Sequence, residues 1–357
     1  MAHQFEESDS MAWGGQVPWH GLGKQLPSDV VTAEEMLEYS GLDWGFLKRQ
    51  VIEKDHAGNI IEQNEVPGVP VYAPIGDGKV VVVPNKYAMV RNDNYQPVGV
   101  VGAGYVPILN RESFNFLDEV TGTKEAKYHV AGSLFGGARV FVVLKLPEPL
   151  QITNQDIVDK YLTLVNSHDG SLKLTAFYTP IRVVCNNTLT AAVRGMKKEH
   201  AVKIRHTGNI LNKLVEAKEI LGFAERSYAK LGDVFSEFVK LDMVSNSLQL
   251  YFERVVNMRD AYDEKGNLNR TVKTRKDNQI ALLTSIFENP LNAMPQTRGS
   301  LWAAYNSVTE YADHHKITRN MNNDVDPRER RMQSILFASS AKLKQRAFDL
   351  ATEMIAA

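Results

Sequence analysis

Residues 128–146, YHVAGSLFGGARVFVVLKL, decide the fold of this 357-residue chain. Two runs rich in β-branched and aromatic residues, Tyr128–Leu134 and Ala138–Leu146, lie on either side of the pair Gly136-Gly137. Such runs around a glycine turn predict two antiparallel strands. Further strands are predicted at Tyr161–Asn166, Ser171–Tyr178 and Ile181–Cys185, with Pro180 at a strand start or edge. Because the turns between these strands are short, we expect an antiparallel meander.

Helical signals lie on both sides of this sheet. Thr32-Ala-Glu-Glu35 has the spacing of a capping box and predicts a short helix that runs to Gly41. Residues 44–109 are strand-like, and Asn110 is placed as the N-cap of a helix. After Asn187 helical periodicity dominates; Ile204-Arg-His-Thr207 is expected to open the long helices, and patterns follow at 208–263, 278–288, 299–317 and 328–356.

The predicted fold class is therefore α+β: an antiparallel sheet domain with flanking helices, followed by a helical C-terminal region. We divide the chain into an N-terminal loop and helix packed on the core (1–43), an antiparallel α+β domain (44–193) and a helical region (194–357). Within the first part, the tryptophan-containing loop Trp13–Gly23 either packs against the core or clamps a ring of a ligand.

Composition excludes several classes of protein. Hydrophobic residues make up 43% and charged residues 23%, which is typical of a folded globular chain and not of a disordered one. The net charge is −1, but residues 171–213 hold 8 basic and 1 acidic side chains, while residues 1–70 hold 4 basic and 12 acidic ones. The basic part is therefore the candidate anion-binding surface, with a solvated face as the alternative.

The single cysteine, Cys185, excludes an intramolecular disulfide and suits a reducing compartment. It is either a nucleophile at a helix N-terminus or a buried, inert thiol. The first ten residues are acidic and polar, unlike a signal peptide. The longest uncharged stretch, Asn94–Asn110, is too short and too interrupted to span a bilayer. We therefore expect a cytoplasmic protein without a membrane partner.

Candidate nucleic-acid-binding residues lie in the basic part. They are Arg182, Arg194, Lys197, Lys198, Lys203, Arg205 and His206. Cations of this kind can follow a phosphate backbone, and aromatic side chains beside them can stack on bases. The aromatic candidates on the sheet are Tyr128, Phe135, Phe141, Phe177 and Tyr178, with burial in the core as the alternative.

A second constellation concerns catalysis. Trp302, Asn306, Glu310 and His314 are four residues apart on one predicted helix, with Asp313 beside them. Glu310 and His314 can ligate a divalent metal, and His168-Asp169 at a turn can supply an acid–base pair. The alternatives are a polar helix face or hydrogen-bond network for the first set, and turn capping for the second. The chain has no Walker loop and no dinucleotide-binding or zinc motif.

Five stretches together resemble one known family. They are Pro18–Gly23, Asn166–Gly170, Arg182–Leu189, Ile204–Thr207 and Leu301–His314, and they occur in the expected order over nearly the whole chain. The chain resembles the phage/plasmid-like protein family, a domain of unknown function found in phages, prophages and conjugative plasmids. The resemblance implies a mobile-element setting, where DNA replication, recombination and evasion of defence are common tasks. It assigns no reaction to any residue.

These observations favour a mobile-element protein of DNA metabolism that binds single-stranded DNA and anneals it as a homo-oligomer. We predict no cofactor, and we favour a binding role over an enzymatic one. Two alternatives stay open: a metal-dependent enzyme acting on a nucleotide or nucleic acid through Glu310, Asp313, His314, His168 and Asp169, and a non-enzymatic inhibitor of a host factor.

Overall fold

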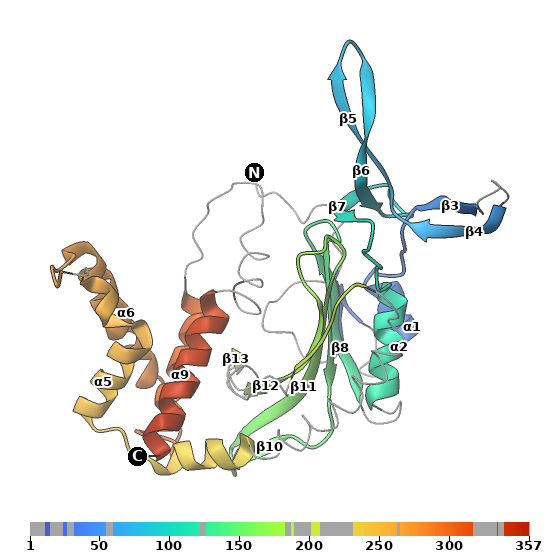
Figure 1. Ribbon diagram of the computed structural model, residues 1–357. Coiled ribbons are helices and arrows are strands. Elements are labelled where there is room, and N and C mark those ends of the chain that lie inside the picture. The colour runs from blue at the N-terminus through green and yellow to red at the C-terminus, as the bar shows by residue number, and fades with distance from the viewer. Residues whose placement is uncertain are drawn as a thin grey trace. The chain divides into compact units, whose positions relative to one another are not determined.

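The computed structural model in Figure 1 describes residues 11–14, 24–26, 32–54, 60–121, 126–182, 187–188, 201–207, 231–262, 265–316, 334 and 339–356. It consists of two compact units, which are described separately. Unit 1 comprises Met1–Lys145, Leu162–Phe177 and Val202–Leu221, and unit 2 comprises Leu146–Tyr161, Tyr178–Ala201 and Gly222–Ala357. Antiparallel sheets and C-terminal helices confirm the predicted α+β class.

The main sheet has the strand order β13-β12-β11-β9-β8-β1-β2. Its strands are β1 (Met11–Trp13), β2 (Lys24–Gln25), β8 (Lys127–Leu134), β9 (Arg139–Lys145), β11 (Asp156–Ser167), β12 (Leu174–Arg182) and β13 (Asn187–Thr188). β10 (Leu150–Thr153) also pairs with β11, and β14 (Ala201–Ile204) pairs with β12. β8 is antiparallel to β9 and β1, whereas β1 and β2 are parallel.

The predicted central strands are confirmed, with two differences. β8 and β9 are the hairpin predicted around Gly136-Gly137. β12 continues through Pro180 to Arg182, so the two strands predicted on either side of this proline are one. An extended backbone is compatible with the fixed φ of proline, and only the N–H is lost. Ala201–Ile204 is a strand and not the start of a helix, because it pairs with β12.

Two helices of unit 1 pack close to this sheet. α1 (Ala33–Tyr39) has the predicted capping box: the Glu35 amide donates to Thr32 Oγ1 at 3.2 Å, and the Thr32 amide donates to Glu35 Oε2 at 2.8 Å. α2 (Asn110–Thr121) contacts α1, and its Phe114 ring stacks on Tyr128 of β8 with centroids 5.3 Å apart. Figure 1 shows α1 and α2 alongside β8.

Two small antiparallel sheets also belong to unit 1. β3 (Lys48–Lys54) and β4 (Ile60–Pro67) form a hairpin. β5 (Val69–Gly76), β6 (Lys79–Val90) and β7 (Pro97–Gly102) form a three-stranded sheet in that order. β5 and β6 extend well beyond β7 as a projecting hairpin (Figure 1).

Unit 2 contains the C-terminal helices. Residues 231–240 are helical and are followed by α5 (Ser245–Val256), η2 (Met258–Ala261), α6 (Arg270–Phe287), α7 (Leu301–Glu310), η3 (Tyr311–His315) and α9 (Ser339–Ala356). Every residue of α7 is buried, and its Trp302 packs on Phe235 with ring centroids 4.7 Å apart. Trp302 Nε1 donates to Asp156 Oδ2 at 2.7 Å, so the apolar core of this unit encloses polar bonds.

Candidate functional site

The turn Asn166–Gly170 is held to unit 1 by its own polar groups. Asn166 Nδ2 donates to the Ile108 carbonyl at 2.8 Å, and the His168 amide donates to the Ala138 carbonyl at 2.8 Å. Asp169 Oδ1 accepts from the Ser171 amide at 2.8 Å, as turn capping predicts. Gly99 lies so close that a Cβ there would be 2.5 Å from the Asp169 Cα. This motif therefore has a defined structural role.

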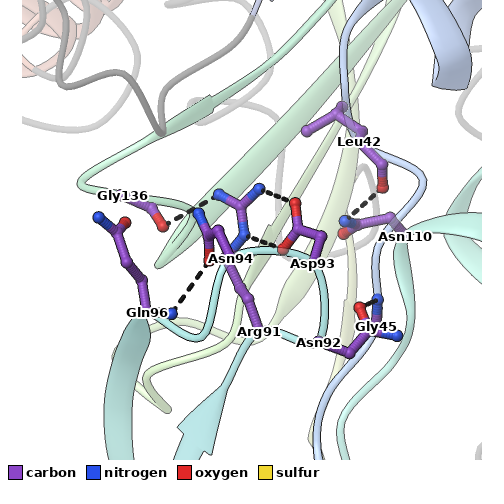
Figure 2. A network of polar contacts seen from close by, with 9 residues as sticks. All are labelled: Leu42, Gly45, Arg91, Asn92, Asp93, Asn94, Gln96, Asn110 and Gly136. Atoms are coloured by element: carbon purple, nitrogen blue, oxygen red, sulfur yellow. Dashed lines mark hydrogen bonds and ion pairs between the residues drawn. The ribbon is translucent and has the colours of Figure 1, made fainter.

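His168 lies fully buried beneath that turn. Its Nε2 is 2.9 Å from Asn110 Oδ1, while Asn110 Nδ2 donates to the Leu42 carbonyl at 2.9 Å (Figure 2). Asn110 Oδ1 is an acceptor in this arrangement, so His168 Nε2 carries the proton. The imidazole also makes edge contacts with Trp44 and Phe46, at centroid distances of 5.2 and 5.0 Å. Among the described residues, His168 Nδ1 has no hydrogen-bond partner.

The pKa of His168 is lowered to about 3. Burial is the largest cause, the charges of His206 and Arg91 act in the same direction, and Asp169 opposes them. The imidazole is therefore neutral at physiological pH. This differs from the predicted acid–base pair, because His168 bonds to Asn110 and Asp169 caps Ser171.

A buried arginine also contacts Trp44. The Arg91 guanidinium is 4% exposed, lies 4.4 Å from the Trp44 ring centroid and holds Asp93 through two bonds of 2.9 and 2.6 Å (Figure 2). Burial alone would raise the pKa of Asp93, but hydrogen bonding and attraction from Arg91 lower it overall. Gly137, at φ 98°, lets the β8–β9 turn approach, since a Cβ there would be 3.0 Å from Trp44.

His206, one of the predicted nucleic-acid contacts, is buried rather than exposed. Its ring stacks on Tyr105 at 4.9 Å and 22°, and Tyr105 donates its hydroxyl to the Ser167 carbonyl at 2.8 Å. Burial lowers the pKa of His206, opposed by nearby backbone groups of Val106 and Leu172 and by Asp169. Neither ring nitrogen makes a well-formed hydrogen bond among the described residues. A side chain packed in this way does not reach a phosphate.

The residues before His206 differ in their exposure. On β14, Val202 and Ile204 are buried and Lys203 is exposed, as alternation along a strand requires, and Arg205, which follows the strand, is exposed as well. On β12, which pairs with β14, Leu174 and Ala176 are buried. The outward positions at this end of β12 hold exposed Lys173 and the partly exposed Thr175 and Phe177. We call Lys173, Thr175, Phe177, Lys203 and Arg205 the basic face.

The side chains of the other predicted cations and of Cys185 lie outside the described residues. Arg182 lies at the end of β12, and its side chain lies outside the described residues, as do Arg194, Lys197, Lys198 and Cys185. Of the aromatic candidates, Tyr128 and Phe141 are buried, at 4% and 2% exposure, because β8 and β9 are covered. Phe135 and Phe177 are partly exposed, and the Tyr178 side chain is not described. Trp13 is buried in β1, while residues 15–23 of its loop lie outside the described part.

The predicted metal-binding helix face in unit 2 is rearranged by a π-helical turn. η3 (Tyr311–His315) follows α7, and π-helical spacing brings residue i+5 rather than i+4 beside residue i. Accordingly, Glu310 Oε1 lies 3.6 Å from His315 Nε2, a neighbour that the predicted i, i+4 spacing did not include. The second oxygen of Glu310 accepts from Asn292 Nδ2 at 2.7 Å.

Asp313 is committed to a different partner. Its Oδ1 lies 2.7 Å from Lys344 Nζ of α9, and both side chains are fully buried. Burial lowers the pKa of Lys344, and the charge and hydrogen bond of Asp313 oppose that effect. Within the described ranges, no three histidine, cysteine or carboxylate side chains are grouped to hold a metal ion. The 166–170 turn belongs to unit 1 and the 301–316 segment belongs to unit 2, and each is described within its own unit.

Sequence reasoning missed three residues of the unit 1 cluster: Trp44, Arg91 and Asn110. Asn110 was predicted as an N-cap, but its side chain bonds to Leu42 and lies against His168. A polar residue at the start of an apolar helix pattern indicated a cap at Asn110, but it did not indicate the hydrogen-bond partners of the side chain. No local pattern marked Trp44 or Arg91, because their contacts with each other and with His168 join residues that are tens of positions apart.

Comparison with known proteins adds a family. Residues 97–336 match the sequence profile of a domain of unknown function (DUF932). The chain belongs to this family. The matched region includes α2, the central strands of the main sheet, β14 and α7. No curated protein and no solved structure matches the chain significantly.

None of the helices in the described part of the chain is both long enough and apolar enough to cross a bilayer.

Proposed function

We propose that this DUF932 protein binds single-stranded nucleic acid through the basic face of unit 1 and acts in DNA metabolism of a mobile element. The observation that carries the proposal is the pair Lys203 and Arg205, two exposed cations that alternate with the buried residues Val202, Ile204 and His206. Neither cation forms an ion pair within the described residues, so both charges are available to an anion.

The spacing of these cations suits an extended polyanion. Lys203 lies on β14 and Arg205 directly follows its last residue, so two exposed cations lie close together along the chain, where they can contact successive phosphates. Lys173, which directly precedes β12, is a third exposed cation, and the partly exposed ring of Phe177 is available for stacking on a base. A rigid sheet that offers charge and one aromatic surface is typical of binding without sequence preference.

Buried residues next to the basic face hold its backbone in place. His206 fixes β14 through its stack on Tyr105 and through the bond of 2.8 Å from the Val106 amide to the His206 carbonyl. His168 is closed off from solvent, so its role here is to position the turn that precedes β12. Annealing of complementary strands would follow from several such faces in one oligomer.

The test is fluorescence anisotropy of labelled single- and double-stranded oligonucleotides, titrated with salt. Binding of the wild type should prefer single strands and weaken as salt rises. The double variant Lys203→Ala, Arg205→Ala removes two phosphate contacts, so the slope of log affinity against log salt should decrease in magnitude by about 1.4.

A matched control removes two lysines elsewhere in unit 1. Lys24 and Lys127 are exposed and lie outside the basic face, so Lys24→Ala, Lys127→Ala makes the same charge change and should leave the slope as in the wild type. Equal slopes for all three proteins would remove this face from the interface. Absence of binding at low salt would reject the proposal and leave the metal-dependent enzyme and the host-factor inhibitor to be tested.

A further inference from the structure

The tip of the β5–β6 hairpin, residues Tyr72–Val82, presents apolar side chains to solvent; we call it the arm. Its exposed fractions are 57% for Tyr72, 60% for Ile75, 60% for Val80, 44% for Val81 and 54% for Val82. The charged residues of the arm are Asp77 and Lys79. Consecutive exposed valines in a strand are a strong aggregation signal unless another surface covers them.

The arm is a two-stranded ribbon in which neither β5 nor β6 has a further partner strand among the described residues. β6 pairs with β7 from Lys86 onwards, so between Lys79 and Val82 its outer edge has no partner strand among the described residues. The pairing with β5 shifts register between the arm and the base of the hairpin, where Asn85 has a φ of 56°. A two-stranded ribbon by itself is marginally stable in water, so an additional strand would stabilise the arm.

The two edges of the arm differ in their protection. β5 carries Pro70 and Pro74, which lack the N–H that a neighbouring strand needs, and proline on an edge strand blocks further pairing. β6 has no proline between Lys79 and Val83, and all four residues after Lys79 are valine. The open edge of the arm is therefore the edge of β6.

We propose that the β6 edges of two copies of this chain pair antiparallel about a two-fold axis at Val81. In this register Val81 lies opposite Val81 of the partner subunit, and Val80 lies opposite Val82 of the partner subunit. Pairs of β-branched residues across strands are favourable, and the contact is self-complementary without any charge on the partner.

The contact expected from this pairing is small. The edge-to-edge pair brings together the main chains and the half-exposed Val80, Val81 and Val82 of β6, whereas Tyr72 and Ile75 lie on β5, the strand away from the partner subunit. The apolar area that it buries is therefore below the roughly 1,000 Å² of a stable specific interface, as in weak, transient contacts. The dimer is therefore expected to depend on protein concentration. A lipid surface fits less well, because Asp77 lies at the tip and Lys79 is the one cation of the arm.

Disulfide trapping tests the register directly. In a full-length Cys185→Ser background, Val81→Cys places one thiol at the proposed axis, where opposite Cα atoms of an antiparallel pair lie within disulfide range. Oxidation should convert most of the protein to a covalent dimer. Val100→Cys is the matched control, since Val100 is 54% exposed on β7 of the same small sheet. It should give little dimer.

Sedimentation tests the dimer without a cross-link. A lysine on a strand edge opposes pairing, so Val81→Lys should weaken self-association at least tenfold, while Val100→Lys should leave it unchanged. Both substituted side chains are exposed, and circular dichroism checks that each variant is folded. A wild type that stays monomeric, equal trapping of both cysteine variants, or an arm that binds phospholipid vesicles as a monomer would each overturn the proposal.

Discussion

The buried imidazole of His168 makes stability depend on pH in a defined window. Its pKa is about 3 in the folded protein and 6.5 without burial. Between these values the unfolded chain binds a proton that the folded chain does not, so stability decreases as the pH falls below 6.5. From pH 6.5 to about 4.5 the loss is on the order of 2–3 kcal/mol, since one pH unit corresponds to about 1.4 kcal/mol.

The variant His168→Gln removes this titration while keeping an amide that can donate to Asn110 Oδ1. It loses the edge contacts with Trp44 and Phe46, so it should be less stable than the wild type at about pH 7.5. Urea unfolding of both proteins at about pH 7.5 and about pH 4.5 measures the difference. That difference should shrink by about 2–3 kcal/mol at the acidic pH, because only the unfolded wild type gains a proton on His168. A difference that stays constant with pH would refute the reasoning.

Two further predictions concern buried contacts. Asp313→Asn leaves the Lys344 ammonium buried without this counter-charge, so the free energy of unfolding should fall by about 3–5 kcal/mol. The double variant Asp313→Leu, Lys344→Met removes both charges and should regain much of that loss. Urea unfolding followed by circular dichroism measures both variants, and an equal loss in the two would contradict the argument. Gly137→Ala puts a Cβ at a residue with a φ of 98° and 3.0 Å from Trp44, so it should lower the free energy of unfolding by about 1–3 kcal/mol in the same measurement. At Gly102 a Cβ meets nothing within 4 Å, so Gly102→Ala should be close to neutral.

Much of the fold follows from local signals. The capping box at Thr32 and Glu35, the glycine turn between β8 and β9 and the helical period of the C-terminal region act over a few residues, and the structure confirms each of them. Short strands that owe their existence to a neighbour, such as β10 and β14, carried no comparable signal. Their backbone groups are paired only after the sheet has assembled.

The candidate site was less accessible to the same reasoning. Helical spacing predicted Glu310 beside His314, but one π-helical turn moved the contact to His315. Charge counting identified the basic part of the chain, yet it treated Lys203, Arg205 and His206 alike. The structure separates them, because His206 is buried against Tyr105 whereas Lys203 and Arg205 are exposed.

By itself, the amino-acid sequence determined the α+β class, the central strands and the location of the cationic segment, since periodicity, caps and charge are properties of neighbouring residues. Only the tertiary structure decided which polar groups are enclosed. Arg91, Asn110 and His168 meet around Trp44 because the β6–β7 turn, α2 and the β11–β12 turn converge on one core. Such contacts join residues that are distant in the chain, and desolvation on packing, rather than any local pattern, gives His168 its neutral state.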